Sequence, residues 1–130
     1  MAGKEQVARD FQFLKDKVLA VLIFGSSTEG EGRDTDICIV APHGFDLKEV
    51  FKRVDVTGKK YDVWTFEELP LYMKMEVMEN HIIIICEDVP ELFEYFYQFR
   101  KLWKDQEHRN KLTKEEINSI LEARKLERNR

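Results

Sequence analysis

Two aspartates separated by one residue stand at the start of an apolar run, and their spacing is the first sign of chemistry in this chain. Asp34 and Asp36 open the run that continues through residues 37–40. Successive side chains of a β-strand point to opposite faces, so carboxylates two positions apart point the same way. Mg²⁺ is commonly held by one or two carboxylates together with phosphates and water. The spacing therefore predicts metal-dependent phosphate chemistry.

A glycine-containing turn lies directly before the acidic pair. The apolar run 18–24 predicts a central strand, and it ends at Gly25, which is followed by Ser26 and Ser27. Glycine lets the backbone approach a phosphate, and hydroxyl and N–H groups at the start of a following helix would bind it. We therefore predict that Gly25, Ser26 and Ser27 bind the phosphates of a nucleotide.

A third carboxylate lies in the middle of another predicted strand. Residues 60–66 alternate so that Tyr61 and Val63 share one face, while Asp62 shares the other with Trp64. A buried aspartate without a partner or a metal would be costly. On a neighbouring strand, Asp62 would complete a two-metal site in which the ions bind the attacking and leaving oxygens.

These residues resemble a known family. Gly25-Ser26, then Asp34-Thr35-Asp36, then Asp62 on a later strand are similar to the nucleotidyltransferase superfamily that shares the polymerase beta palm. The length and the order of elements resemble the minimal nucleotidyltransferases of prokaryotes. The resemblance implies an α+β palm, with a small mixed sheet flanked by helices and a helical C-terminal extension. It also implies transfer of a nucleoside monophosphate from an NTP, with Asp34, Asp36 and Asp62 as catalytic residues that hold two Mg²⁺ ions.

The resemblance also suggests a partner. Many minimal nucleotidyltransferases act with a small helical protein of the HEPN class, some of them as antitoxins that attach AMP to a tyrosine of the partner. We therefore expect transfer of AMP from ATP to a hydroxyl of a HEPN-type toxin. Two alternatives stay open. One is an inactive palm that serves as a partner-binding antitoxin or scaffold, and the other is nucleotidyl transfer to RNA or a small molecule.

The turn departs from the family pattern in two ways. Seven residues separate Ser26 from Asp34, fewer than is common in minimal members, so a second register would make Asp36 the first acid and place Cys38 second. We prefer the first register because residues 37–40 then continue the strand. The turn also carries two glutamates where minimal members often carry arginine, and Arg33 is the residue expected to compensate in binding the nucleotide.

The composition limits the class of protein. The chain has 130 residues and a formal net charge of -4, which argues against bulk electrostatic binding of nucleic acid. Neither a signal peptide nor an apolar run long enough to cross a membrane is evident, so we expect a cytoplasmic protein. We expect one nucleotidyltransferase domain over residues 1–130, with a core at about 4–86 and C-terminal helices at about 89–128.

The long helix predicted over residues 89–109 carries aromatic side chains on more than one face. An inward stripe and a second stripe are each made of four large side chains. The first is Leu92, Phe96, Phe99 and Trp103, and the second is Phe93, Tyr95, Tyr97 and Leu102. One core covers one stripe, so the Phe93–Trp103 helix is predicted to form an interface with a partner or with a second copy of the chain.

Overall fold

Four strands form one mixed sheet in the order β3-β2-β1-β4 in the computed structural model, which describes residues 3–25, 28, 34–106 and 114–128. At its centre, β1 (Ala20–Phe24) is antiparallel both to β2 (Thr35–Val40) and to β4 (His81–Ile85), whereas β3 (Tyr61–Thr65) is parallel to β2. Every residue of β1 and β2 is buried, as expected for apolar strands covered on both faces. The predicted small mixed sheet and its central strand are confirmed.

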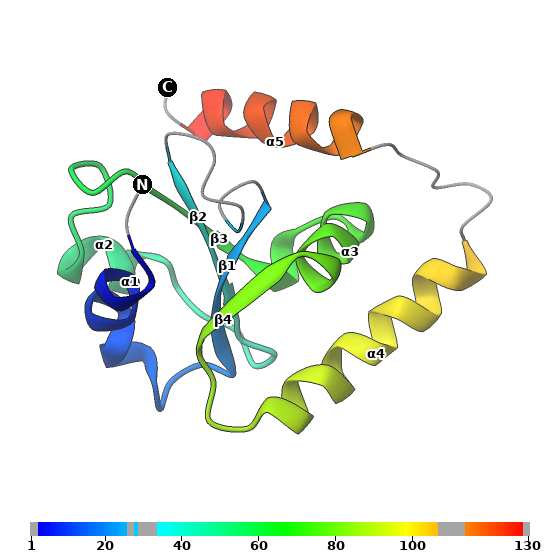
Figure 1. Ribbon diagram of the computed structural model, residues 1–130, viewed down its shortest axis with the longest axis horizontal. Coiled ribbons are helices and arrows are strands. Elements are labelled where there is room, and N and C mark those ends of the chain that lie inside the picture. The colour runs from blue at the N-terminus through cyan, green and yellow to red at the C-terminus, as the bar shows by residue number, and fades with distance from the viewer. Residues whose placement is uncertain (1–2, 26–27, 29–33, 107–113, 129–130) are drawn as a thin grey trace.

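Helices cover both faces of the sheet (Figure 1). Their bounds are α1 Lys4–Phe11, α2 Lys48–Arg53, α3 Leu71–Glu79, α4 Val89–Asp105 and α5 Lys114–Arg128. One apolar cluster joins β1 and β2 to α1 and α2, and a second joins them to α3, α4 and α5. This two-sided arrangement is the predicted α+β class.

Apolar spacing in the sequence predicts helices over residues 4–17 and 67–80, the second with Pro70 in its first turn, and the structure changes one boundary of each. The first helix ends at Phe11 and continues as a short 3-10 turn over Gln12–Leu14. The helix expected from residue 67 begins at Leu71, because the ring of Pro70 disfavours helical backbone at the residue before it and Leu69 is extended, with a ψ of 143°. Pro70 thus lies at the N-cap instead of in the first turn.

The inward face of α4 follows the predicted stripe. Leu92 and Phe96 are fully buried, and Phe99 and Trp103 pack against the same cluster. Tyr95 was expected on the second stripe, but it lies half-buried because its hydroxyl donates to Glu67 Oε2 at 2.9 Å. The outward face therefore keeps exposed side chains, which are Val89, Phe93, Tyr97 and Leu102.

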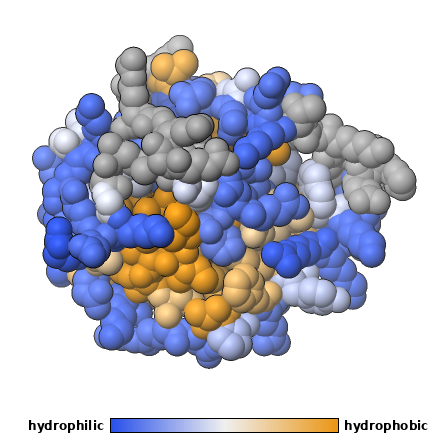
Figure 2. All heavy atoms as spheres, in the orientation of Figure 1, coloured by the Kyte–Doolittle hydropathy of each residue, from blue (hydrophilic) through white to orange (hydrophobic). Residues whose placement is uncertain are grey.

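An apolar area also marks the edge of the sheet. β4 is an edge strand, and its residues 82–84, all isoleucine, are only half-buried. Figure 2 shows an apolar area in the region where β4 lies in Figure 1. In the described part of the chain, every helix is too short or too polar to cross a bilayer.

The packing of α4 makes a test of the core. Phe96 is fully buried, with its ring centroid 5.2 Å from that of Phe66, whereas Tyr97 on the same helix is 64% exposed. Phe96→Ala should lower the free energy of unfolding by about 3–5 kcal/mol, because it leaves a cavity. Tyr97→Ala, the control, should change it by less than about 0.5 kcal/mol. Urea unfolding measures both, and equal losses would contradict the assigned inward face.

Candidate active site

The pairing of β2 with β3 brings two predicted site residues together. Asp36 and Asp62 are direct partners in the parallel register of these strands. Both acids lie on the face that carries Cys38 and Trp64, which belong to the cluster beneath α3, α4 and α5. Asp36 is only 4% exposed, so its carboxylate is held inside the protein.

Asp34 lies at the outer end of the same strand. It precedes β2, is exposed, and lines one hollow together with Asp62. Cys38 is fully buried among apolar side chains, and burial raises the pKa of its thiol well above the ordinary value. A neutral thiol is a poor ligand for Mg²⁺, so these surroundings favour Asp34 over Cys38 as the companion of Asp36.

Gly25 places the turn after β1 directly against Asp36. Its φ is +66°, a left-handed conformation that other residues rarely adopt, and a Cβ there would lie 3.5 Å from Asp36 Oδ2. The predicted phosphate-binding residues Ser26, Ser27 and Arg33 lie outside the described residues. Among the predicted phosphate-binding residues, the structure therefore places Gly25 beside the acids.

Asn80 supports this turn from another element. Its Nδ2 donates to the carbonyl oxygen of Gly25 at 3.2 Å, and Thr28 Oγ1 lies 2.9 Å from the same oxygen. Thr28 Oγ1 also donates to Asn80 Oδ1 at 2.7 Å. Sequence reasoning missed Asn80, although a polar residue with amide donors at the junction of α3 and β4 was a usable signal.

Two basic residues of α5 contact the paired acids. Lys125 Nζ lies 2.8 Å from Asp36 Oδ1 and 3.6 Å from Asp62 Oδ2. Arg128 donates to Asp62 Oδ1 at 3.1 Å and to the carbonyl oxygen of Val63 at 2.6 Å. Sequence reasoning missed both residues. Their three-residue spacing, which places them on one face of a helix, was the only local signal.

Burial and charge shift the pKa values of these groups in different directions. Burial raises the pKa of Asp36 to about 6, and this effect outweighs the attraction of Lys125. Burial also raises the pKa of Asp62, with repulsion from Asp34 adding to it and the charge of Arg128 opposing it. Burial lowers the pKa of Lys125, but attraction from Asp36 and Asp62 is stronger and leaves it raised. Lys125 is therefore fully charged at neutral pH.

The paired acids suit a Mg²⁺ ion that keeps water and phosphate ligands. The ammonium of Lys125 contacts both carboxylates, so a single cation at this place is shared by Asp36 and Asp62. Mg²⁺ is usually bound in this way, by few carboxylates and by substrate phosphates. Among the described residues, no three histidine, cysteine or acidic side chains are arranged to hold a metal by themselves. The set of three acids that includes Asp34 stays a prediction.

Two hollows open beside the paired acids. One of about 200 Å³ is lined by Gly25, Asp36, Asn118, Leu121, Glu122 and Lys125. The other, of about 550 Å³, has Asp34, Phe51, Lys60, Tyr61, Asp62 and Arg128 among its lining residues. Each hollow therefore includes one of the paired acids and one of the two basic residues from α5.

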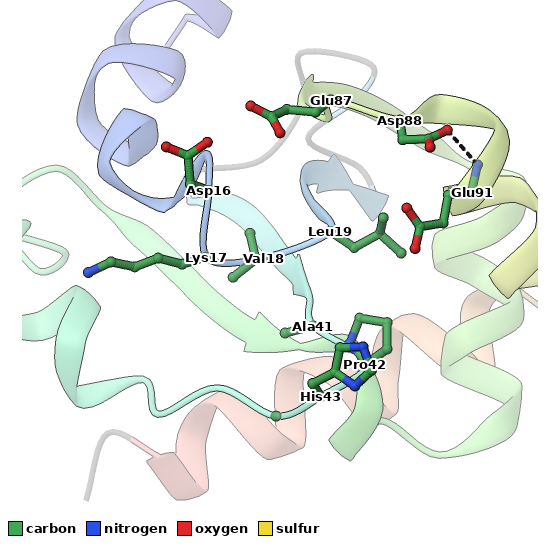
Figure 3. A pocket seen from close by; sticks show the side chains of 11 residues that line it. Asp16, Lys17, Val18, Leu19, Ala41, Pro42, His43, Glu87, Asp88 and Glu91 are labelled. Atoms are coloured by element: carbon green, nitrogen blue, oxygen red, sulfur yellow. Dashed lines mark hydrogen bonds between the residues drawn. The ribbon is translucent and has the colours of Figure 1, made fainter.

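A third hollow lies at the opposite end of the strands (Figure 3). Its volume is about 270 Å³, and its lining includes Leu19 and Ala41, which flank the start of β1 and the end of β2. Asp88 there caps α4, with Oδ1 accepting the N–H of Glu91 at 3.0 Å. Figure 3 shows the carboxylates of Asp16 and Glu91 well separated. Among the described residues no group of three or more acidic side chains, including those of this hollow, is arranged to hold a metal.

Comparison with known proteins decides the family. Residues 4–84 match the nucleotidyltransferase domain family. This chain belongs to that family. A curated relative in Methanocaldococcus jannaschii, named as a candidate protein adenylyltransferase, is 41% identical over 115 residues, which cover 86% of this chain and 89% of the relative. The predicted resemblance is confirmed, and the nucleotidyltransferase is a transferase enzyme.

The same fold occurs in solved toxin–antitoxin complexes. A chain in a complex with AMP-PNP superimposes with a TM-score of 0.61 at 16% identity, covering 82% of the nucleotidyltransferase and 94% of that chain. A chain in the structure of a tri-AMPylated Shewanella oneidensis HEPN toxin with an MNT antitoxin gives a TM-score of 0.57 at 14% identity, covering 81% and 90%. At these identities the likeness concerns the fold, and it confirms the predicted palm.

The pKa of Asp36 leads to a test of its burial. Because its pKa is about 6 in the folded protein and 3.8 ordinarily, the folded state loses stability as the pH rises through this window. Asp36→Asn removes the cost of ionisation and should raise the free energy of unfolding by about 1–3 kcal/mol at pH 7.5, with little change at pH 4. Thermal unfolding without divalent metal measures the difference.

The control for this measurement is Asp16→Asn, which removes an exposed carboxylate at the opposite end of the strands. It should leave the stability unchanged at both pH values. A destabilised Asp36→Asn protein at pH 7.5 would show instead that the ionised carboxylate is held favourably.

Proposed function

We propose that this nucleotidyltransferase transfers AMP from ATP to a hydroxyl of a partner protein, that Mg²⁺ is its cofactor and that the partner is a small helical HEPN-type toxin. The observation that carries the proposal is the register of β2 and β3, which sets Asp36 beside Asp62 next to the turn at Gly25. The candidate protein adenylyltransferase at 41% identity supports a protein acceptor. Structures of the same fold in HEPN toxin–MNT antitoxin complexes support the choice of partner.

The proposed roles follow from the positions of the side chains. Asp36 and Asp62, with Asp34 at the outer end of the strand, hold the metal ions. Bound Mg²⁺ supplies neutralisation of the triphosphate charge and polarisation of the reacting oxygens. The Gly25 backbone and Ser26 position the triphosphate, and Ser27 and Arg33 add to its binding. Because ATP is the proposed donor, we also propose a cytoplasmic location for the protein.

The transfer requires one bond to form and one to break. The acceptor oxygen bonds to the α-phosphorus of ATP, the bond from that phosphorus to the oxygen bridging to the β-phosphate breaks, and pyrophosphate leaves. The hydroxyl proton passes to Asp62, whose pKa is raised by burial. Its side chain is 18% exposed, so an acceptor reaches it from the larger hollow. The smaller hollow beside Gly25 then accommodates part of the donor.

The outward face of α4 is the proposed contact surface for the partner. Phe93 and Tyr97 are 43% and 64% exposed, one helical turn apart. Large aromatic side chains are enriched in the centres of protein interfaces. Pairing of two copies through the same helix is the alternative use of this surface.

A role in binding alone is the second candidate function. The observation that favours it is the ion pair between Lys125 and Asp36, because a lysine neutralises the carboxylate without any metal. In that case the palm would bind and neutralise its partner without transferring a nucleotide.

Transfer of label from ATP separates these functions. With Mg²⁺ and a purified HEPN-type protein, ATP labelled at the α-phosphate should label the partner, whereas ATP labelled at the γ-phosphate should not. Asp62→Asn should reduce labelling by about 10²–10⁴-fold, the range typical of a lost acid–base group. Asp36→Asn should also reduce labelling strongly, because it removes a carboxylate that holds the metal. Asp16→Asn should label at the normal rate.

Each other outcome has a definite meaning. Partner binding without labelling, equal for the normal protein and Asp36→Asn, would support the binding role and contradict the enzyme. Labelling that survives both substitutions would contradict the assigned acids. Label that enters RNA in place of the HEPN-type protein would contradict the protein acceptor.

A further inference from the structure

The last helix lies across the paired acids and supplies their positive charges. Lys125 Nζ contacts both Asp36 and Asp62, and its side chain is only 13% exposed. Arg128 donates to Asp62 and lies over Trp64, with the guanidinium carbon 4.3 Å from the ring centroid. The two cationic groups therefore occupy the surroundings in which a metal ion shared by these acids would lie.

A metal ion that bridges the two carboxylates through Asp36 Oδ1 and Asp62 Oδ2 competes with Lys125 for the same oxygens. A Mg²⁺ ion binds oxygen ligands at about 2.1 Å, and Lys125 Nζ already lies 2.8 Å from Asp36 Oδ1. The ion would repel both basic groups at close range with little solvent between them. Binding of an ion between these two oxygens therefore requires Lys125 to leave, and Arg128 is on the same face of the same helix.

Apart from its charged contacts, α5 is held on the protein by few apolar side chains. Of its fifteen residues, Ile117 and Leu121 are the buried ones, and both belong to the cluster shared with α3 and α4, against which Ile120 packs half-buried. Two buried aliphatic side chains contribute about 1.5–3 kcal/mol each, which is within the range of local opening in folded proteins. Release of α5 therefore needs little of the core to change.

The position of α5 also closes the route to Gly25. The hollow of about 200 Å³ beside Gly25 and Asp36 has the rest of its lining from α5, including Asn118, Glu122 and Lys125. With α5 in place, this hollow holds part of a nucleotide at most. Movement of the helix would open the hollow along its length.

From these contacts we infer that α5 is an autoinhibitory plug, whose Lys125 and Arg128 stand in for the metal ions and must leave before a divalent cation binds Asp36 and Asp62. The resting protein then has its acids neutralised and its nucleotide hollow covered. Binding of the cation and docking of α5 are mutually exclusive, so each weakens the other by the same factor. The inference rests on the proposed function only for the identity of the cation.

Mn²⁺ binding, followed by the paramagnetic signal of the free ion, tests the competition without ATP or partner. Lys125→Gln/Arg128→Gln should bind Mn²⁺ at least about fivefold more tightly, since coupling between sites is commonly 5–150-fold. Arg124→Gln, the control, removes one positive charge from the same helix and should leave the affinity unchanged. Leu121→Ala keeps every charge but loosens α5, so it should also tighten binding.

A second measurement follows the helix itself. In a Trp103→Phe protein, Trp64 is the remaining tryptophan, and it is 7% exposed beneath Arg128. Mn²⁺ should increase quenching of its fluorescence by acrylamide and speed amide hydrogen exchange in residues 114–128. Exchange in β1 and β2 should stay slow, which shows that the variants remain folded.

The opposite results would overturn the plug. One is that Lys125→Gln/Arg128→Gln and Leu121→Ala bind Mn²⁺ no more tightly than the normal protein does. The other is that added Mn²⁺ slows amide hydrogen exchange in α5. A change in binding free energy for Arg124→Gln of half that of the double variant or more would show long-range charge in place of competition. If Mn²⁺ and α5 compete but no AMP is transferred, the proposed function alone is overturned. If AMP is transferred but Mn²⁺ and α5 do not compete, the plug alone is overturned.

Discussion

The pairing of β2 with β3 holds two carboxylates side by side, and the rest of the site depends on this constraint. Asp36 and Asp62 are register partners on one face, where burial raises the pKa of both. Apolar packing on the other face of these strands offsets the free energy needed to bury the two carboxylates. Ile37 and Val63 belong to the cluster on that face. Such a pair needs a cation, and within the described residues Lys125 contacts both acids.

The turn after β1 is tied to the sheet by a residue far along the chain. Asn80 follows α3 and precedes β4, whose first residue, His81, pairs with Phe24. Its amide donates to the carbonyl of Gly25, so the antiparallel pairing of β1 and β4 also sets the position of the turn. The backbone that approaches Asp36 is thus held from the edge strand as well as from the central one.

Local patterns predicted the strands and the faces of their side chains well. The alternation over residues 60–66 placed Asp62 and Trp64 on one face, and the structure has them there, because alternation follows directly from strand geometry. Local patterns failed where one contact overrode them. Tyr95 was assigned to an outward stripe by helical spacing, but its hydroxyl finds Glu67 on another element. The spacing of residues along α4 cannot predict a contact with a residue of another element.

The sequence by itself determined the family, through a glycine turn, two spaced acids and a third acid on a later strand, since each of these is a short-range pattern. The tertiary structure alone decided which charges meet. Asp62 and Arg128 are separated by 66 residues, and Lys125 reaches Asp36 only because α5 docks through Ile117 and Leu121. Salt bridges of this kind leave no period in the sequence, because they depend on how helices pack across the sheet and not on the spacing of neighbouring residues.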